Sequence, residues 1–454
     1  MGDVLTAYNP YTGKVIKTYK KTSELELNEF NLISEKAFEN WKNTPLDKRI
    51  SKLKKIIDLL QKNRQALIDA QISEIGMPKK EAEESFANLI HRLNTFFEID
   101  ESYFNTNQEY PNNINNVISR VPYGKVLIIT PWNHPLTIPL WQIVPALLAG
   151  NVVLWKPSEK ALSVNEIICD LFKQLDLPKG TFNMIVGDYV EAQHILDTYS
   201  INLVCFTGSL SGGKLLQIKC GEKMIPSIME LGGKDALIVC KDADIESATD
   251  ATIVGSLRHS GQLCSSIERI FVHTSVYDGF ISVLLSKTKE IKINNPENID
   301  TVIACLKDKK SEKHIVAQVK NALSKGATIL QGSTDPNLEF PLILTNVDIK
   351  SDLFQEETFG PIIAINTYSS EDELVKKVND CKYGLCCTIW TKNIDMFDFL
   401  QKDINVGTIT LNRLSGTLSR SPWTGRKCSG HGHVLGNNPV EQYTVLKNVR
   451  IKKM

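Results

Sequence analysis

The stretch KVLIIT (125–130) is followed along the chain by NVVLW (151–155), FNMIV (182–186) and LVCF (203–206). Each is a short apolar run of the kind that forms a strand buried on both faces of a sheet. Helical patterns separate them, and strands that alternate with helices form a parallel, doubly wound sheet. The sequence therefore predicts an α/β protein whose ligands bind at the carboxyl ends of its strands.

The rest of the chain extends this pattern in both directions. Residues 28–43, 47–76 and 80–98 carry apolar side chains at helical spacing. A second α/β unit is predicted from Gly232 onward, and the alternating, basic tail 442–452 is predicted to be an exposed or pairing strand. The strands expected in the second unit are 236–239, 269–273, 303–305, 328–330, 362–365, 388–390 and 409–412.

Composition excludes several classes of protein. The 454 residues exceed one ordinary domain, and 42% hydrophobic with 23% charged residues is a globular balance. Acidic and basic residues are equal at 52 each, which predicts no nucleic-acid partner. Ten scattered cysteines without a CxxC pair favour a reducing, cytoplasmic setting over disulfides or zinc. The longest apolar stretch, 136–154, is interrupted by prolines and polar residues, so no membrane span is expected.

Polar motifs follow the predicted strands directly. PWNHP (131–135) and KPSE (156–159) come after the first two strands, and FTGS (206–209) forms a turn suited to polar groups at a helix N-terminus. Further on lie ELGGK (230–234) and GQLC (261–264). Taken alone, a cysteine is usually a small buried hydrophobe and a glutamate a solvated charge or a cap. The pair His431 and His433 lacks other ligands nearby in sequence, so no metal site is predicted.

These five motifs, with EETFGP (356–361) and SPWTGRKCSG (421–430), resemble the ordered motifs of the NAD(P)-dependent aldehyde dehydrogenase superfamily over nearly the whole chain. The resemblance implies a Rossmann-type cofactor domain, an α/β catalytic domain and a small β oligomerisation segment in a homodimer or homotetramer. The expected boundaries are 1–104 and 123–231 for the cofactor domain, 232–427 for the catalytic domain, and 105–122 and 428–454 for the oligomerisation segment.

The same resemblance assigns the chemistry. Cys264 is expected to attack the aldehyde and carry a thioester, with Asn133 donating to the developing oxyanion. Glu230 is expected to activate the water that hydrolyses the thioester. A carboxylate at Glu159 favours NAD, while NADP remains open. The residues expected at the cofactor are Trp132, Lys156, Ser158, Glu159, Gly187, Phe206, Gly208, Ser209, Glu357 and Phe359.

The substrate assignment rests on fewer residues. Arg258, six residues before Cys264, stands where succinate-semialdehyde dehydrogenases have an arginine that binds the distal carboxylate. Trp141 occupies the place of their second arginine and favours an apolar aldehyde, whereas Arg420 is a candidate for the missing charge. His134 and Trp423 depart from the usual family pattern: Trp423 is expected to form a bulkier tunnel wall, and His134 either lines the tunnel or has a structural role. A short-to-medium aldehyde is predicted, with succinate semialdehyde as one candidate; alternatively, Arg258 faces solvent or an acidic neighbour.

Two other functions remain open at this point. An acylating relative would transfer the acyl group to coenzyme A, but that branch generally lacks the water-activating carboxylate, and Glu230 is present. A catalytically silent relative would be expected to lack Cys264 or Asn133, and both are present.

Overall fold

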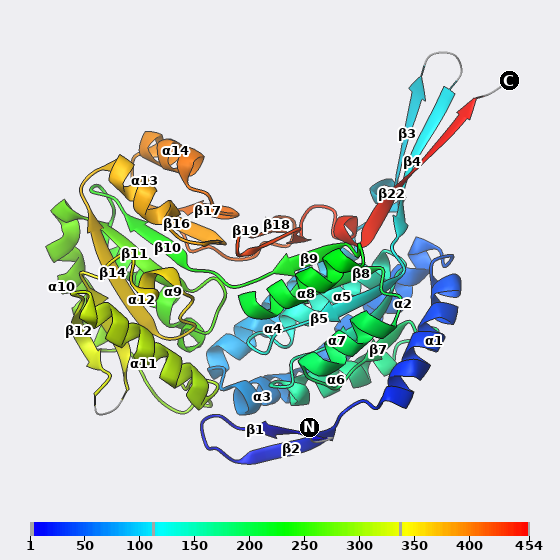
Figure 1. The fold of residues 1–454 in the computed structure, drawn as a ribbon, viewed down its shortest axis with the longest axis horizontal. Coiled ribbons are helices and arrows are strands. Elements are labelled where there is room, and N and C mark those ends of the chain that lie inside the picture. The colour runs from blue at the N-terminus through cyan, green and yellow to red at the C-terminus, as the bar shows by residue number, and fades with distance from the viewer. Residues whose placement is uncertain (1–3, 111–113, 336–337, 453–454) are drawn as a thin grey trace.

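The structure, a computed structural model, describes residues 4–110, 114–335 and 338–452. Two sheet-centred halves lie side by side, and a three-stranded arm projects from one of them (Figure 1). The chain starts with a hairpin of β1 (Val4–Tyr8) and β2 (Val15–Lys20), which runs along the lower edge of the molecule in Figure 1.

The first half is built on a six-stranded sheet in the order β20-β9-β8-β5-β6-β7. Five strands are parallel, as the alternating pattern predicts, and every residue of the neighbouring strands β5 and β6 is buried. The short strand β20 adds to β9 in the antiparallel direction. The strands are β5 (Lys125–Ile129), β6 (Val152–Lys156), β7 (Phe182–Met184), β8 (Leu203–Thr207), β9 (Ser227–Glu230) and β20 (Gly430–His431).

Helices cover both faces of this sheet (Figure 1). The single helix expected over 47–76 is two helices, because the chain leaves helical geometry at Asn63, with φ −103° and ψ 15°. The first helix begins at a capping box in which Ser23 and Glu26 satisfy each other's backbone N–H groups. The helices are α1 (Glu24–Trp41), α2 (Leu46–Lys62), α3 (Arg64–Ile75), α4 (Lys79–Phe96), α5 (Thr137–Leu148), α6 (Leu162–Lys173), α7 (Tyr189–Thr198) and α8 (Leu210–Glu222).

The second half contains a seven-stranded sheet in the order β12-β13-β14-β11-β10-β16-β17. Its strands are parallel except for the β12–β13 pair. The expected strand at 303–305 is wrong, since only an isolated bridge joins Ile303 to Ile293. The strands are β10 (Asp235–Val239), β11 (Ile267–His273), β12 (Thr328–Ser333), β13 (Glu339–Thr345), β14 (Ile362–Tyr368), β16 (Cys386–Trp390) and β17 (Thr408–Leu411). The helices are α9 (Ile245–Leu257), α10 (Tyr277–Thr288), α11 (Lys309–Ser324), α12 (Asp352–Gln355), α13 (Glu371–Asn379) and α14 (Ile394–Asp403).

The projecting arm joins segments that are far apart in sequence. Strand β4 (Ile114–Pro122) pairs with β3 (Asn105–Tyr110) on one side and with β22 (Thr444–Lys452) on the other, all antiparallel. Of the tail expected at 428–454, only β22 lies in the arm, because β20 pairs with β9 in the first sheet.

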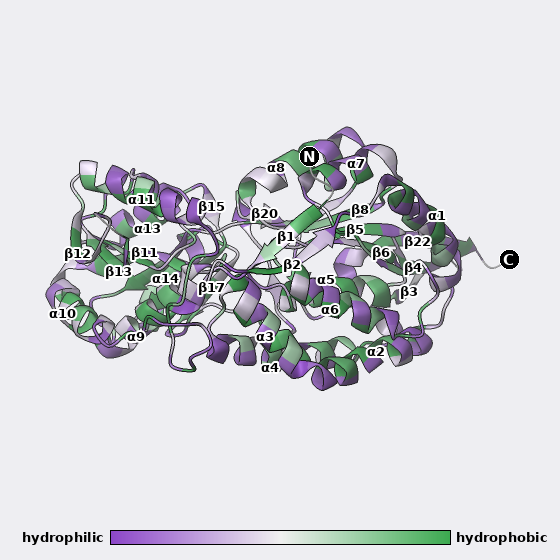
Figure 2. Ribbon diagram, turned by 90° about the horizontal axis from the view of Figure 1, so that it is seen from below, coloured by the Kyte–Doolittle hydropathy of each residue, from purple (hydrophilic) through white to green (hydrophobic). Residues whose placement is uncertain are grey.

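Hydrophobic residues are concentrated on the strands, whereas the surrounding helices show both hydrophilic and hydrophobic residues along their length (Figure 2). Such amphipathic helices pack their hydrophobic face against a sheet and expose their hydrophilic face to water. Among the described helices, none is long and apolar enough to cross a membrane.

Candidate active site

Two cavities approach the same cysteine from different sides. One, of about 600 Å³, lies at the carboxyl ends of β5, β6 and β8. The other, of about 370 Å³, lies between α4, α5 and the segment 416–423. Both are lined by Cys264, together with Ile138, Thr207 and Leu231. The thiol therefore stands where a ligand in one cavity can meet a ligand in the other.

A left-handed turn presents this cysteine. After α9 ends, His259, Ser260 and Gly261 all have positive φ, at 51°, 55° and 70°. A side chain on Gly261 would overlap the backbone of Gly360, so this position favours glycine on both conformational and steric grounds. Positive φ values are strained for His259 and Ser260, and such strained residues are often found at functional sites.

The amide of Asn133 reaches this turn from the loop after β5. Its Nδ2 donates to the backbone oxygen of Gln262 at 3.0 Å, and the side chain is buried. An amide nitrogen carries two hydrogens, so one N–H remains for an oxygen that gains charge beside Cys264. The expected oxyanion donor and the expected nucleophile are thus brought together.

Glu230 is the last residue of β9 and lines the smaller cavity with Cys264. Among the described residues, neither of its carboxyl oxygens has a hydrogen-bond partner, although both are buried. Burial raises the pKa of Glu230 well above its usual value. A buried, unpartnered carboxyl group with a raised pKa is suited to accept a proton from water near neutral pH.

Burial also raises the pKa of the Cys264 thiol, and the carboxyl groups of Asp235 and Glu357 act in the same direction. The raised pKa favours the thiol form of Cys264 over the thiolate. Because the thiolate is the nucleophile, a positive charge or a proton acceptor beside Cys264 is needed for reaction.

A buried ion pair holds the loop at 356–361. Glu268 on β11 pairs with Lys234 and accepts hydrogen bonds from the backbone N–H groups of Thr358 at 2.8 Å and Phe359 at 2.9 Å. In the same loop, Glu357 accepts a hydrogen bond of 3.2 Å from the N–H of Gly233. The sequence analysis did not identify Glu268; the available signal was a charged residue inside an apolar strand.

The larger cavity suits a dinucleotide in size, in its place at the sheet edge and in the chemistry of its lining. Lys156 Nζ lies 3.4 Å from the carboxylate of Glu159, and Ser209 caps the N-terminus of α8. Gly187 does not line this cavity; a side chain there would meet Glu191. The expected residues that line it are Trp132, Lys156, Ser158, Glu159, Phe206, Gly208, Ser209, Glu357 and Phe359.

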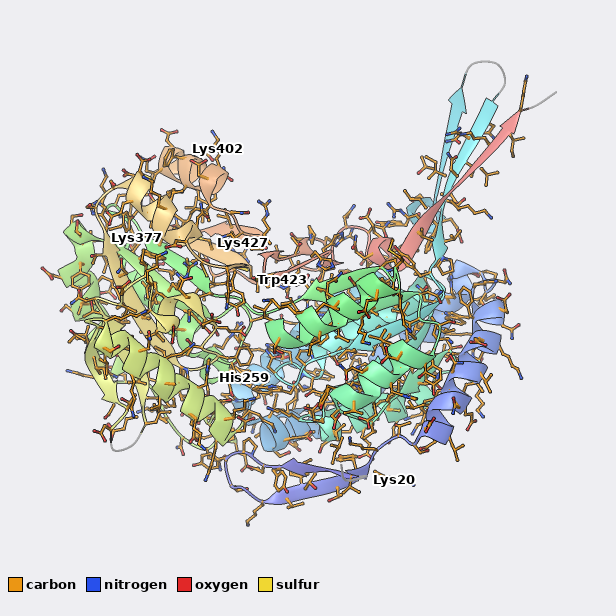
Figure 3. All side chains as sticks on the ribbon, in the orientation of Figure 1. Lys20, His259, Lys377, Lys402, Trp423 and Lys427 are labelled. Atoms are coloured by element: carbon orange, nitrogen blue, oxygen red, sulfur yellow. The ribbon has the colours of Figure 1, made fainter. Side chains whose placement is uncertain are left out.

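The smaller cavity is lined by four of the five expected substrate residues, namely His134, Trp141, Arg258 and Trp423. Arg420 is the exception, because its guanidinium pairs with Glu98 and it does not line this cavity. The cavity also contains Arg92 from α4, a residue that the sequence analysis missed because nothing in a helical pattern marks which polar position turns inward. His259 and Trp423 both lie in the central region between the two halves (Figure 3).

His431 and His433 have separate hydrogen-bond partners. His431 Nε2 lies 3.1 Å from the hydroxyl of Ser227, whereas His433 Nε2 lies 3.0 Å from the amide of Gln442. Within residues 4–110, 114–335 and 338–452, no group of three or more His, Cys, Asp or Glu side chains is placed to hold a metal ion.

A thiol that faces a nucleotide cavity on one side and a substrate cavity on the other is an arrangement for oxidising a substrate held on sulfur. Comparison with known proteins agrees: the model of the aldehyde dehydrogenase family matches residues 2–449. The chain belongs to this family and is an NAD(P)-dependent aldehyde dehydrogenase.

Individual relatives differ in their named substrates. The chain is 32% identical to a D-glyceraldehyde dehydrogenase (NADP(+)) of Picrophilus torridus, over 99% of this chain and 93% of that protein. It is 28% identical to a betaine aldehyde dehydrogenase of Vibrio vulnificus, over 99% of this chain and 95% of that protein.

Solved structures show the same fold. A betaine aldehyde dehydrogenase of Staphylococcus aureus in complex with NAD+ superposes with a TM-score of 0.93 at 29% identity, covering 99% of this chain and 91% of that one. A 3,6-anhydro-L-galactose dehydrogenase in complex with NAP superposes with a TM-score of 0.94 at 28% identity, covering 99% of this chain and 96% of that one.

Proposed function

We propose that the protein oxidises a short-to-medium aldehyde to the carboxylic acid through a thioester on Cys264, which water hydrolyses with the help of Glu230. The observation that carries this proposal is the shared cavity: the thiol and an unpartnered, buried carboxyl group line the same space. Asn133 adds the amide donor that an attacked carbonyl oxygen requires.

The steps follow from these three groups. Cys264 gives up its thiol proton to water, its sulfur bonds to the aldehyde carbon, and the carbonyl electron pair moves to the oxygen under the N–H groups of Asn133 and the Cys264 backbone. Hydrogen then leaves that carbon with its electron pair, and NAD(P), when bound, supplies the acceptor for it. The resulting thioester is attacked by water as Glu230 takes the water proton, which breaks the carbon–sulfur bond and releases the acid.

Hydrolysis is favoured over transfer to coenzyme A. A carboxyl group such as Glu230 that is buried without partners beside the thioester has no structural role in hydrogen bonding among the described residues. Leaving such a group unsatisfied costs free energy, and a role in activating water accounts for its presence.

Several features of the smaller cavity favour a substrate with a polar or acidic end. Arg258 and Arg92 both line it, and a guanidinium binds carboxylate oxygens with directed hydrogen bonds. Two arginines disfavour a cationic aldehyde of the betaine type, although Glu81 and Glu84 also line the cavity. Succinate semialdehyde is the proposed test substrate, with glyceraldehyde as the hydroxylated alternative.

We also propose that the protein is a homodimer or homotetramer. Four apolar residues of β22 are exposed at an open strand edge of the arm, and such an edge invites pairing with another chain. They are Val445, Leu446, Val449 and Ile451. Light scattering that gives a monomer at micromolar concentration would contradict this proposal.

All ten cysteines are free, which supports a reducing compartment such as the cytoplasm.

Rapid mixing of aldehyde and NAD with Glu230→Gln tests the proposed function. A burst of NADH equal to the enzyme concentration is expected, followed by a much slower steady state. The wild type should release free acid without coenzyme A. A normal steady-state rate for the variant, or product that forms only as a coenzyme A thioester, would overturn the hydrolytic assignment.

A further inference from the structure

Arg92 is a buried cation without an anionic partner. The residue is 6% exposed, and no carboxylate in the described part of the chain forms a salt bridge with it. Its Nη2 donates to the hydroxyl of Thr417 at 2.6 Å and to that residue's backbone oxygen at 3.1 Å. Its Nε is buried with no partner among the described residues. The guanidinium is thus held in place but left with unused donor capacity.

An aromatic wall fixes the orientation of this side chain. The guanidinium carbon lies 4.7 Å from the ring centroid of Trp141, a cation–π contact. Both residues line the cavity that ends at Cys264. Stacking on Trp141 and bonding to Thr417 come from different elements, so the guanidinium plane is constrained before any ligand arrives.

The acidic groups that line the cavity do not neutralise Arg92. Glu81 accepts a hydrogen bond of 2.7 Å from the backbone N–H of His259, and burial raises the pKa of this carboxyl group to about 7. Glu84 is exposed two turns before Arg92 on α4, and Glu230 is the carboxyl group proposed above to activate water. Burial lowers the pKa of Arg92 to about 10, which still leaves it charged at neutral pH.

Arg92 and Arg258 act on the same space. Burial lowers the pKa of His134 well below its usual value, and the positive charges of Arg258 and Arg92 act in the same direction. His134 follows the oxyanion donor Asn133 directly in sequence. The charges of both arginines therefore act on His134, which lines the same cavity.

We propose that Arg92 is the residue that determines substrate specificity, binding a carboxylate at the distal end of a short aldehyde whose reacting end is at Cys264. The proposal rests on the proposed function and names the substrate class of that site, a semialdehyde carrying a carboxylate. The sequence predicted Arg258 for this task, with Arg420 as a candidate second charge; the geometry points to Arg92, on α4.

The kinetic test compares Arg92→Met with a matched control, Arg64→Met. Arg64 also lies over an aromatic ring, that of Phe86, but is exposed and does not line the cavity. We expect Arg92→Met to lower kcat/KM for succinate semialdehyde about 10- to 100-fold, mainly through KM, and to change butanal by less than about 2-fold. Arg64→Met should leave both substrates unchanged.

A binding test separates this inference from the proposed chemistry. Succinate should bind to Cys264→Ala in calorimetry and should lose that affinity in Cys264→Ala/Arg92→Met. Should Arg92→Met fail to fold, Arg92→Lys retains the charge without the planar guanidinium. The Arg92→Lys variant is expected to bind succinate more weakly than the protein with Arg92 does.

If Arg92→Met lowers kcat/KM equally for butanal and succinate semialdehyde, Arg92 has a structural role. Equal losses for glyceraldehyde and succinate semialdehyde would show recognition of hydroxyl groups rather than of an anion. Either result, or succinate binding that does not depend on Arg92, overturns the inference. Binding of succinate that depends on Arg92, in an enzyme that forms no thioester, would instead overturn the proposed function and leave this inference standing.

Discussion

Asn133 Nδ2 donates a hydrogen bond of 3.0 Å to the backbone oxygen of Gln262, two residues before the nucleophile. The two residues come from different halves of the molecule, since Asn133 follows β5 of the first sheet and Gln262 lies between α9 and β11 of the second half. One contact therefore ties Asn133, the proposed oxyanion donor, to the turn that presents Cys264, the proposed nucleophile, across the junction of the two halves.

Replacing Asn133 by alanine is expected to lower kcat about 10²- to 10³-fold, because one donor to the oxyanion is lost. The affinity for NAD should stay close to that of the wild type. Single-turnover formation of NADH measures the effect on the first chemical steps. A loss confined to KM would show that this amide binds the ground state rather than the developing charge.

How far the sequence determines this structure varies between elements. The runs at 125–130 and 151–155 were predicted correctly because continuous apolar strands carry their own signal. Strand β9 was missed, since SIME (227–230) is short and ends in a charged residue whose burial depends on its neighbours.

The site shows the same division. Cys264, Glu230 and Asn133 were predicted as site residues from ordered motifs: Cys264 and Glu230 line one cavity, and Asn133 bonds to the turn that carries Cys264. Glu268 and Arg92 were not predicted as site residues, because the role of each arises only from contacts between segments distant in sequence. Arg420, in the loop before Pro422, was a candidate for the missing substrate charge, but it pairs with Glu98 and does not line the cavity.

The pH dependence of turnover should report Glu230. Because burial raises the pKa of this carboxyl group, its proton-accepting form is lost as the pH falls through a value well above 4.5. We expect kcat to rise with pH through that window in the wild type. The residual turnover of Glu230→Gln should lack this acidic limb; an unchanged limb in the variant would assign it to another group.

The buried pair of Glu268 and Lys234 should contribute strongly to stability. Glu268→Gln leaves the buried Lys234 without its anion, which is expected to cost about 3–5 kcal/mol. Urea unfolding measures this loss. As a control, Glu166→Gln removes the exposed partner of Lys17 and should cost less than about 1 kcal/mol. Equal effects of the two substitutions would contradict the structural role of Glu268.

Arg258 should contribute less to selectivity than its position in the sequence indicates. The side chain lines the cavity but is exposed, and solvent weakens a contact between charges there. We expect Arg258→Leu to reduce the preference for succinate semialdehyde over butanal by less than about 5-fold. A loss of 100-fold, measured as the ratio of kcat/KM values, would make Arg258 the main carboxylate anchor instead.

The central claim, a thioester on Cys264 that Glu230 helps to hydrolyse, is tested most directly by mass spectrometry of the acyl-enzyme. Glu230→Gln is mixed with aldehyde and NAD, quenched in acid and digested. The account predicts that the peptide containing Cys264 gains the mass of one acyl group, in an amount equal to the NADH formed, and that hydroxylamine removes it. An unmodified Cys264 peptide after stoichiometric NADH formation, or an acyl group on another of the ten cysteines, would contradict it.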